Sequence, residues 1–469
     1  MSDRRISPET ANRLFHVAFL AQLVVPLLFV ADLTTAWWVN GNLWWYGFGA
    51  TGQAAFVFCI FWIVTVLALY FLGRYANWFS LAWLKGPLVA VYSVVFALVV
   101  LELFLQVLPQ GEIKPALWPP VRQALLEPDP KLMPGVHGDS TFTGNSVGIR
   151  GPELPELNDR DQVYKIVTVG GSTTESLYLD DSEEWPHLIM ESLNAAQETN
   201  PVWVGNAGQS GRNAVDHLEL MRTLPILAEA DLLIFLLGLN DLQPTLAFEG
   251  ETTQAVLEDN AAKFGRQVLR GGGYPRPGFP VFKRLDLFER TKTSSAAAMA
   301  SLAPSSVLGR VGVGPGSYID LRRQMRAGAP TVSLPDLQLG LEEYRLRIED
   351  IVQECESRGI RCLYLTQPSM WRSDLDEDEK KLLWFGWIGR EFDPIGYVTA
   401  RDAGAAMDSY NQELLNICER DGLECLDLAA AVPKDVSSFY DDVHFNEEGA
   451  RTVSSFLTEY LLSTPPFSE

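Results

Sequence analysis

The chain has 469 residues, enough for about three domain-sized units. It contains 37 Lys and Arg residues against 59 Asp and Glu residues, a formal charge of −22. That balance excludes the basic face that a nucleic-acid-binding protein needs. Apolar residues make up 47% of the chain and charged residues 20%, which excludes a disordered chain.

Long apolar stretches near the N-terminus are the first predicted elements. They lie near residues 14–36, 54–72 and 87–108. Each is long enough to cross a bilayer as a helix, which takes about 20 residues. A cleaved signal peptide is the alternative for the first stretch, because Arg4 and Arg5 precede it, but two further apolar stretches follow. We therefore expect a bundle of three transmembrane helices in residues 1–109.

Positive charges near these stretches predict their orientation. Arg13 precedes the first stretch, and Arg74 and Lys85 lie between the second and the third. The first connection has no Lys or Arg but contains several Trp residues, as is typical of a membrane interface. The sequence thus predicts a multi-pass protein of the cell inner membrane with a cytoplasmic N-terminus. Its partner would be the lipid bilayer, and everything after residue 109 would lie on the outer, periplasmic face.

Four of the five Cys residues form two pairs with the same spacing, Cys355/Cys362 and Cys418/Cys425. Each pair flanks a Gly turn between a predicted helix and a predicted strand. In an outward-facing domain such pairs favour local disulfides, while four reduced, buried thiols remain the alternative. A zinc site usually has closer pairs, so no metal is expected.

Residues 110–162 begin with a Pro-rich stretch and are expected to form a linker and lead-in segment. Residues 163–469 then alternate apolar runs with helical periods. Strands are predicted at 165–171, 202–208, 231–241, 360–368 and 422–429. Helices are predicted near 183–196, 213–225, 252–269 and 447–462. This alternation predicts a parallel sheet covered on both faces, with functional residues at the carboxyl ends of the strands.

Two stretches interrupt the alternation. Residues 242–338 are rich in Gly, Pro and Ser outside one helical run, and residues 369–400 are acidic and then aromatic. Long insertions at the carboxyl end of a sheet are candidates for a lid or a substrate wall, although a passive surface loop is equally possible.

Two residues have the features of a catalytic couple. Ser172 follows a predicted buried strand and precedes a helix, which exposes its hydroxyl beside free backbone N–H groups. His444 precedes the last predicted helix, and Asp441 can accept a hydrogen bond from its ring. The other histidines lie at a membrane stretch, in an irregular stretch or inside predicted helices, so His444 is the candidate base.

Oxyanion donors are predicted at two other strand ends. Gly211 follows the second strand, and its backbone N–H can approach a substrate closely. Asn240 lies at the end of the third strand and has an amide donor. Each residue alone is more typical of a turn. Together with Ser172 and His444, they give candidate residues at the ends of four predicted segments in chain order, and this combination favours a catalytic site.

This ordered set resembles the SGNH (GDSL-type) hydrolase family over roughly residues 163–462. The resemblance implies Ser172 as nucleophile, His444 as base and Asp441 as the residue that orients His444. It also implies an oxyanion hole made by the backbone N–H groups of Ser172 and Gly211 and the side chain of Asn240.

The family fold is α/β, a flavodoxin-like three-layer α/β/α sandwich with a parallel five-stranded sheet. NSVGIRGPE (145–153) looks like the lead-in of membrane-anchored bacterial members. One departure is that the Asp of Gly-Asp-Ser-Leu is replaced by Gly171.

The resemblance and the predicted orientation favour an esterase that hydrolyses an O-acyl group, acetyl or short-acyl, on an envelope glycan or lipid. The first alternative is an O-acyltransferase that passes the acyl group to a glycan hydroxyl. The second is a catalytically inactive glycan-binding module. No cofactor is implied, and the oligomeric state stays open.

Overall fold

The structure, a computed structural model, describes residues 114–118, 123–155, 163–196, 201–269, 317–391 and 393–468. All of them belong to one compact unit, formed by Ile113–Tyr274 and Pro304–Glu469. Within these ranges no helix has both the length and the apolar character needed to span a bilayer. The three predicted transmembrane helices lie outside the described residues.

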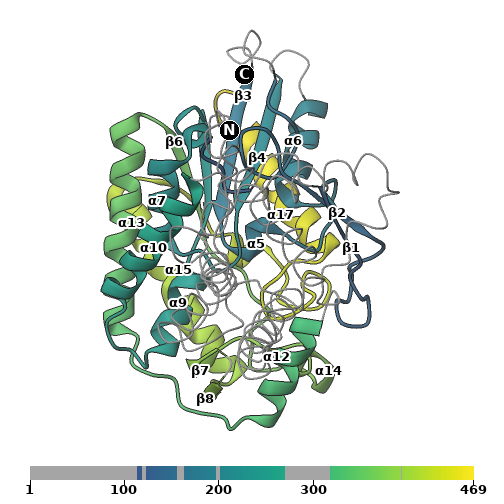
Figure 1. Cartoon of the computed structure of the whole chain (residues 1–469), viewed down its shortest axis with the longest axis vertical. Coiled ribbons are helices and arrows are strands. Elements are labelled where there is room, and N and C mark those ends of the chain that lie inside the picture. The colour runs from purple at the N-terminus through teal and green to yellow at the C-terminus, as the bar shows by residue number, and fades with distance from the viewer. Residues whose placement is uncertain are drawn as a thin grey trace, which may run out of the picture. The chain divides into compact units, whose positions relative to one another are not determined.

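Five parallel strands form the central sheet (Figure 1). In spatial order they are β4 (Val202–Gly208), β3 (Tyr164–Gly170), β5 (Leu232–Leu236), β6 (Arg361–Leu365) and β9 (Glu424–Leu426). Every neighbouring pair is parallel, which confirms the predicted sheet. The apolar side chains of β3 and β5, such as Ile166 and Leu233, are fully buried and form the centre of the core.

The order of the strands determines where a site can form. From β3 the chain crosses to β4 at one edge, and it then returns to β5 on the other side of β3. Connections that leave in opposite directions open a crevice at the carboxyl ends of the strands. The segments that directly follow β3, β4 and β5 carry Ser172, Gly211 and Asn240, so all three predicted residues lie at this reversal.

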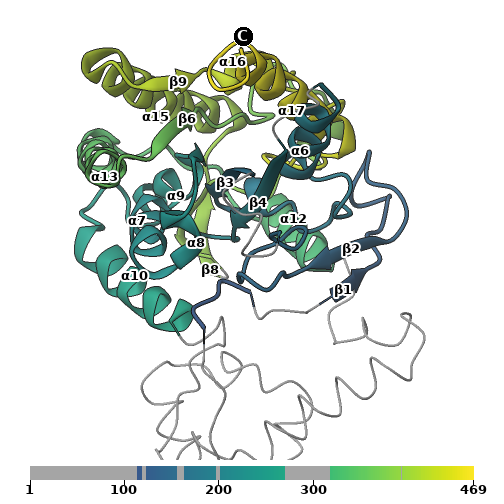
Figure 2. The same ribbon diagram turned by 90° about the horizontal axis from the view of Figure 1, so that it is seen from above.

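Helices cover both faces of the sheet (Figure 2). On one face α6 (Trp185–Ala196) packs against α17 (Glu447–Leu462). On the other face α13 (Gln338–Arg358) packs against both α7 (Ala214–Thr223) and α15 (Ala400–Asp421), and α10 (Gln254–Val268) packs on α7. This is the expected three-layer arrangement.

The predicted strand 231–241 is too long. β5 ends at Leu236, and α9 (Leu239–Ala247) begins three residues later. Gly238, the N-cap residue of α9, has a φ of +110°, a conformation that suits glycine. The apolar run continues past it because α9 is buried as well, so Asn240 lies in the first turn of a helix.

The predicted strand 422–429 is also too long. β9 ends at Leu426, because Asp427 caps the short helix α16 (Leu428–Ala431) by accepting a hydrogen bond from the Ala430 backbone N–H. The other short helices are α5 (Ser172–Glu175), α8 (Pro225–Ala228) and α14 (Glu377–Lys380).

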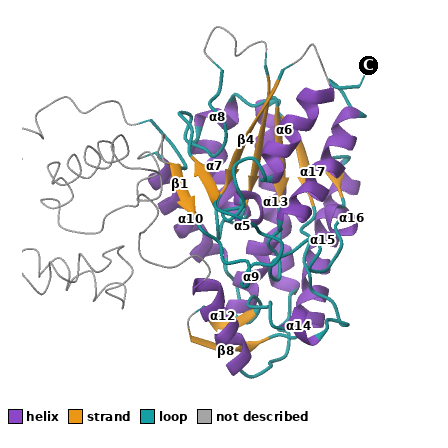
Figure 3. Ribbon diagram, turned by 90° about the vertical axis from the view of Figure 1, so that its right-hand side faces the viewer, coloured by secondary structure: helices purple, strands orange, loops and turns teal. Residues whose placement is uncertain are grey.

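The two insertions contain structure that the sequence pattern did not predict. The first ends with α12 (Ser317–Gly328). The second contains α14 and the antiparallel pair β7 (Trp387–Arg390) and β8 (Asp393–Tyr397). Figure 3 shows α12, α14 and β8 together at the end of the molecule toward which the strands run, below α5. The α12 end of the first insertion and the described part of the second insertion therefore lie at the end of the sheet where the site is expected.

Both predicted cysteine pairs are disulfide-bonded. Cys355–Cys362 joins the end of α13 to β6, and Cys418–Cys425 joins the end of α15 to β9. A glycine in the left-handed conformation ends each helix inside the loop that the bond closes. In the lead-in segment, β1 (Gln123–Leu126) and β2 (Ser140–Thr143) form an antiparallel pair.

Candidate active site

Ser172 lies where the chain leaves β3 and begins α5. It is partly buried, and its Oγ lies 2.8 Å from Nε2 of His444. As the first residue of α5, it has a backbone N–H that the helix itself does not use. The structure thus brings the predicted nucleophile and base within hydrogen-bonding distance.

Asp441 orients the His444 ring. Its Oδ2 lies 2.8 Å from Nδ1 of His444, and its Oδ1 accepts hydrogen bonds from the backbone N–H groups of Val443 and His444. A carboxylate can only accept, so Nδ1 carries the proton and Nε2 is left to accept the Ser172 proton. The loop ends at Asn446, which caps α17 by accepting from the Gly449 backbone N–H.

The charges of the site favour a strong base. Burial disfavours the charged form of His444, but Asp441, together with Asp442 and Glu175, outweighs burial and raises the pKa of His444 above its ordinary value. Burial also opposes the charge on Asp441, but His444 and the donated hydrogen bonds lower the pKa of Asp441. Asp441 therefore stays ionised beside the imidazole.

Asn240 extends toward the Ser172 turn from the first turn of α9. Its Nδ2 donates to the backbone carbonyl of Arg212 at 2.9 Å, and an amide nitrogen has a second N–H. Gly171 makes room for this amide, because a Cβ on Gly171 would overlap Nδ2 of Asn240. Gly211 precedes Arg212 and has a φ of +76°. The structure thus places the Asn240 amide beside Gly171 and Arg212, the chain neighbours of Ser172 and Gly211.

Glu175 is a residue of this region that the sequence pattern missed. Its carboxylate is buried and accepts hydrogen bonds from the backbone N–H of Ser210, at 2.7 Å, and from the Ser210 hydroxyl. Burial raises the pKa of Glu175, although the Ser210 hydrogen bonds oppose it. This contact joins α5 to the loop that carries Gly211. The one feature of the sequence that indicates a role for Glu175 is its position three residues after Ser172.

Arg150 is a second missed residue, and it lies in the lead-in segment. Its side chain is fully buried and donates to the backbone carbonyls of Glu175 (2.7 Å), Ser176 (2.9 Å) and Leu179 (2.8 Å). Its Nε also donates to Asp181 at 2.9 Å. One arginine thereby holds the chain that follows Ser172 in place.

Glu184 lies beside Arg150 in a buried cluster. Its Oε2 accepts a hydrogen bond from Nδ2 of Asn206 and lies 3.3 Å from Nε of Arg150. Asn206 also donates to the backbone carbonyl of Thr174 at 2.7 Å. Burial raises the pKa of Glu184 to about 7, despite the attraction of Arg150.

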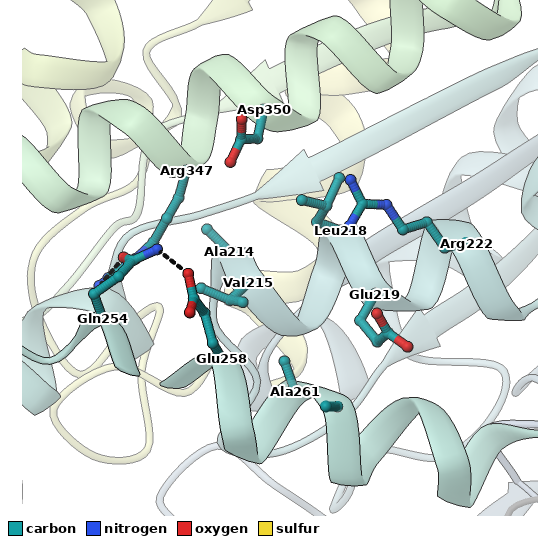
Figure 4. A pocket seen from close by; sticks show the side chains of 11 residues that line it. Ala214, Val215, Leu218, Glu219, Arg222, Gln254, Glu258, Ala261, Arg347 and Asp350 are labelled. Atoms are coloured by element: carbon teal, nitrogen blue, oxygen red, sulfur yellow. Dashed lines mark hydrogen bonds between the residues drawn. The ribbon is translucent and has the colours of Figure 1, made fainter. Parts of the chain in front are cut away.

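A separate cavity of about 290 Å³ lies between α7, α10 and α13 (Figure 4). Charged side chains on its wall are Glu219, Arg222, Glu258, Arg347 and Asp350. Gln254 pairs with two of its neighbours, donating to Glu258 at 2.6 Å and accepting from Arg347 at 3.3 Å. None of the predicted catalytic residues lines this cavity.

The comparisons with known proteins give the family. No curated protein matches the chain. One similar solved structure is LAE5, an alpha/beta hydrolase enzyme from the metagenome of Lake Arreo, Spain, at 14% identity with 65% of this chain and 97% of that chain covered and a TM-score of 0.34. Another is Axe2, an acetylxylan esterase from Geobacillus stearothermophilus, at 13% identity with 63% and 93% covered and a TM-score of 0.34. The GDSL-like Lipase/Acylhydrolase family matches residues 168–452, more than half of the sequence, and the chain therefore belongs to this family of acyl hydrolases.

Proposed function

We propose that the protein is a serine esterase that hydrolyses an O-acyl ester, acetyl or short-acyl, of an envelope glycan or lipid. The observation that carries this proposal is the continuous hydrogen-bonded chain from Ser172 through His444 to the buried Asp441. Membership in the acylhydrolase family supports the reaction class. The predicted outer location supports the choice of an envelope substrate.

In the first half of the reaction, Oγ of Ser172 attacks the ester carbonyl carbon while Nε2 of His444 takes the hydroxyl proton. Negative charge develops on the carbonyl oxygen, where the second N–H of Asn240 and the backbone N–H groups of Ser172 and Gly211 would stabilise it. The carbon–oxygen bond to the alcohol breaks, and His444 returns the proton to the leaving oxygen. The product is an acyl-enzyme on Ser172.

In the second half, His444 removes a proton from water, which attacks the acyl-enzyme. The carboxylic acid leaves, and Ser172 regains its proton. Asp441 stays ionised throughout and stabilises the imidazolium form of His444 in both halves.

Covalent labelling tests the role of Ser172. The full-length chain in detergent should hydrolyse p-nitrophenyl acetate and react with a fluorophosphonate probe, while Ser172→Ala should do neither. Ser176→Ala is a matched control from the same turn, because the Ser176 hydroxyl faces the Thr173 carbonyl rather than His444. Labelling of Ser172→Ala at the wild-type rate would exclude Ser172 as nucleophile. An unlabelled wild type would favour an inactive glycan-binding module.

Product analysis tests the reaction. With an acetylated glycan as donor, the esterase should release acetate in the presence and in the absence of a second glycan. Transfer of the acetyl group to that glycan, with little free acetate, would instead show an O-acyltransferase.

We also propose that three N-terminal helices anchor the protein in the cell inner membrane, with the catalytic domain outside. The distribution of Arg and Lys around the three apolar stretches supports this topology. A C-terminal alkaline phosphatase fusion should be active and a C-terminal fluorescent-protein fusion dark. The reverse result would place the site in the cytoplasm and contradict an envelope substrate.

A further inference from the structure

Trp384, in the second insertion, contacts Asp441, the residue proposed to orient His444. Its Nε1 donates a hydrogen bond to Oδ2 of Asp441 at 2.9 Å. Both side chains are buried, with Trp384 6% and Asp441 0% exposed. Val443 and His444, the backbone donors to Asp441, belong to the same loop as Asp441 itself, whereas Trp384 is 57 residues away in the sequence. The insertion thus supplies a donor that the loop cannot provide.

The Trp384 ring also lies against the catalytic histidine. Its plane is 12° from that of His444, with ring centroids 5.9 Å apart. The ring of Tyr440 is likewise near-parallel to His444, at 5.5 Å and 9°. Flat contacts of this kind limit how far an imidazole can tilt away from Ser172.

Contacts to the backbone and to the ring of Trp384 hold this residue in place. Asp442, next to Asp441 in the sequence, accepts hydrogen bonds from the backbone N–H groups of Trp384 and Phe385. The Arg322 guanidinium of α12 lies 4.8 Å from the ring centroids of both Trp384 and Trp387. These contacts hold the indole in one place relative to Asp441.

α12 connects this aromatic segment to the catalytic loop. Arg323 donates to the backbone carbonyl of Tyr440 at 3.0 Å and to that of Leu382 at 3.1 Å. Arg326 donates to the carbonyls of Phe385 and Val398. The end of the first insertion therefore holds the second insertion against the loop of His444.

We propose that Trp384 is a positioning residue of the catalytic site, whose indole N–H holds the Asp441 carboxylate in the orientation that His444 requires. This inference rests on the proposed function. Trp384 acts through Asp441 and does not touch the substrate, so it should influence turnover rather than substrate binding. The other charged groups that act on Asp441 and His444 are Glu175 of α5, Asp442 of the His444 loop and Arg323 of α12. A substitution at Trp384 keeps all three of these residues.

The test uses Trp384→Phe, which keeps an aromatic ring and removes the N–H donor together with part of the indole, a loss of volume that the control below shares. With p-nitrophenyl acetate and the full-length chain in detergent, kcat should fall about 10-fold, as expected for one hydrogen bond to a charged group, with KM unchanged. In the Asp441→Asn background the same substitution should change kcat by less than about two-fold, because the group it acts on is already lost.

Trp371→Phe is the matched control. The Trp371 indole donates to the neighbouring Asp442 at 2.8 Å, so this variant loses a similar buried bond outside the catalytic couple. Its Tm should fall about as much as that of Trp384→Phe, while its kcat stays within about two-fold of wild type. Trp384→His restores a ring N–H and should retain a higher kcat than Trp384→Phe. If Trp384→Phe does not fold, Trp384→Leu removes the N–H donor in its place and is measured in the same two backgrounds.

Equal kcat losses in the wild-type and Asp441→Asn backgrounds, a loss confined to KM, or an equal kcat loss in Trp371→Phe would overturn the inference. If the wild type is active, Ser172→Ala is inactive and Trp384→Phe has the kcat of the wild type, this inference alone fails and the proposed function stands. A wild type that neither hydrolyses the ester nor reacts with the fluorophosphonate would remove the proposed function as well.

Discussion

Gly171 is the position at which a single methyl group should disable the site. Its backbone angles, φ −86° and ψ −148°, do not demand glycine. The constraint is space, because an added Cβ would overlap Nδ2 of Asn240, while the next neighbour, the Arg212 carbonyl oxygen, is 3.4 Å away. The Asn240 amide is the end of a side chain that can rotate. Gly171→Ala should therefore fold normally but displace the amide from the oxyanion hole.

The size of the effect follows from that displacement. Loss of one oxyanion donor costs about 10²–10³ in turnover, or about 3–4 kcal/mol of transition-state stabilisation. We expect kcat of Gly171→Ala to fall by this factor, with KM for p-nitrophenyl acetate little changed and Tm close to that of wild type. Gly171→Asp, which restores the family residue, should be at least as impaired, since its side chain also begins with a Cβ.

A double-mutant cycle decides whether the displacement is the cause. Asn240→Ala removes the amide and also makes room for the methyl group. Gly171→Ala should then cost less than about two-fold in the Asn240→Ala background, because the donor is already missing. If the same 10²–10³ loss appeared in both backgrounds, Gly171 would act by another route and the proposed steric conflict would be refuted.

Asp441→Asn should lower kcat by roughly 10⁴-fold, a smaller loss than that of Ser172→Ala. Activity requires neutral His444 and falls as the pH drops through its pKa. Because the Asp441 charge raises that pKa, the acidic limb of the kcat/KM profile should move to lower pH in the variant; an unmoved limb would contradict the assignment. Glu184→Gln tests the buried cluster. The pKa of Glu184 is raised from 4.5 to about 7 on folding, so its contribution to stability is present below pH 4.5 and lost as the pH rises through 7. Between these limits the wild type should lose roughly 3 kcal/mol of unfolding free energy relative to the variant. Unfolding free energies that change equally with pH in wild type and variant would argue against the raised pKa.

The sequence predicts the parallel sheet well because each strand is a buried apolar run that ends at small or polar residues. The same runs mark the turns, so Ser172, Gly211 and Asn240 could be placed at strand ends. The error at 231–241 has the same origin. β5 and α9 are both buried, so no polar residue separates them, and only Gly238 marks the break.

The sequence does not predict the contacts between the insertions. α12 exposes Leu321 and buries Arg322, which reverses the usual amphipathic pattern of a surface helix. The buried guanidinium pairs with Glu391 and lies against the rings of Trp384 and Trp387. Because these partners lie more than 60 residues away, the pattern of apolar and polar residues within α12 does not indicate that Arg322 is buried.

The lead-in segment illustrates a similar limit. NSVGIRGPE (145–153) resembles the lead-in of family members, yet no local pattern in it indicates that Arg150 is fully buried. Its backbone pairs with Asn206 on β4, and its side chain binds the carbonyls that follow Ser172. These are tertiary contacts, which depend on how the whole unit packs rather than on the residues nearby.

The separation of Ser172 from His444 has a consequence for biosynthesis. The two residues meet across 272 positions, and His444 is held by a loop that α17 follows directly. During synthesis the N-terminal part of a chain emerges first, so the ribosome releases the strand that carries the nucleophile long before the base. Until α17 packs against α6, the nascent protein has a serine with no base to activate it. Translation order would thus keep the esterase inactive until α17 is in place.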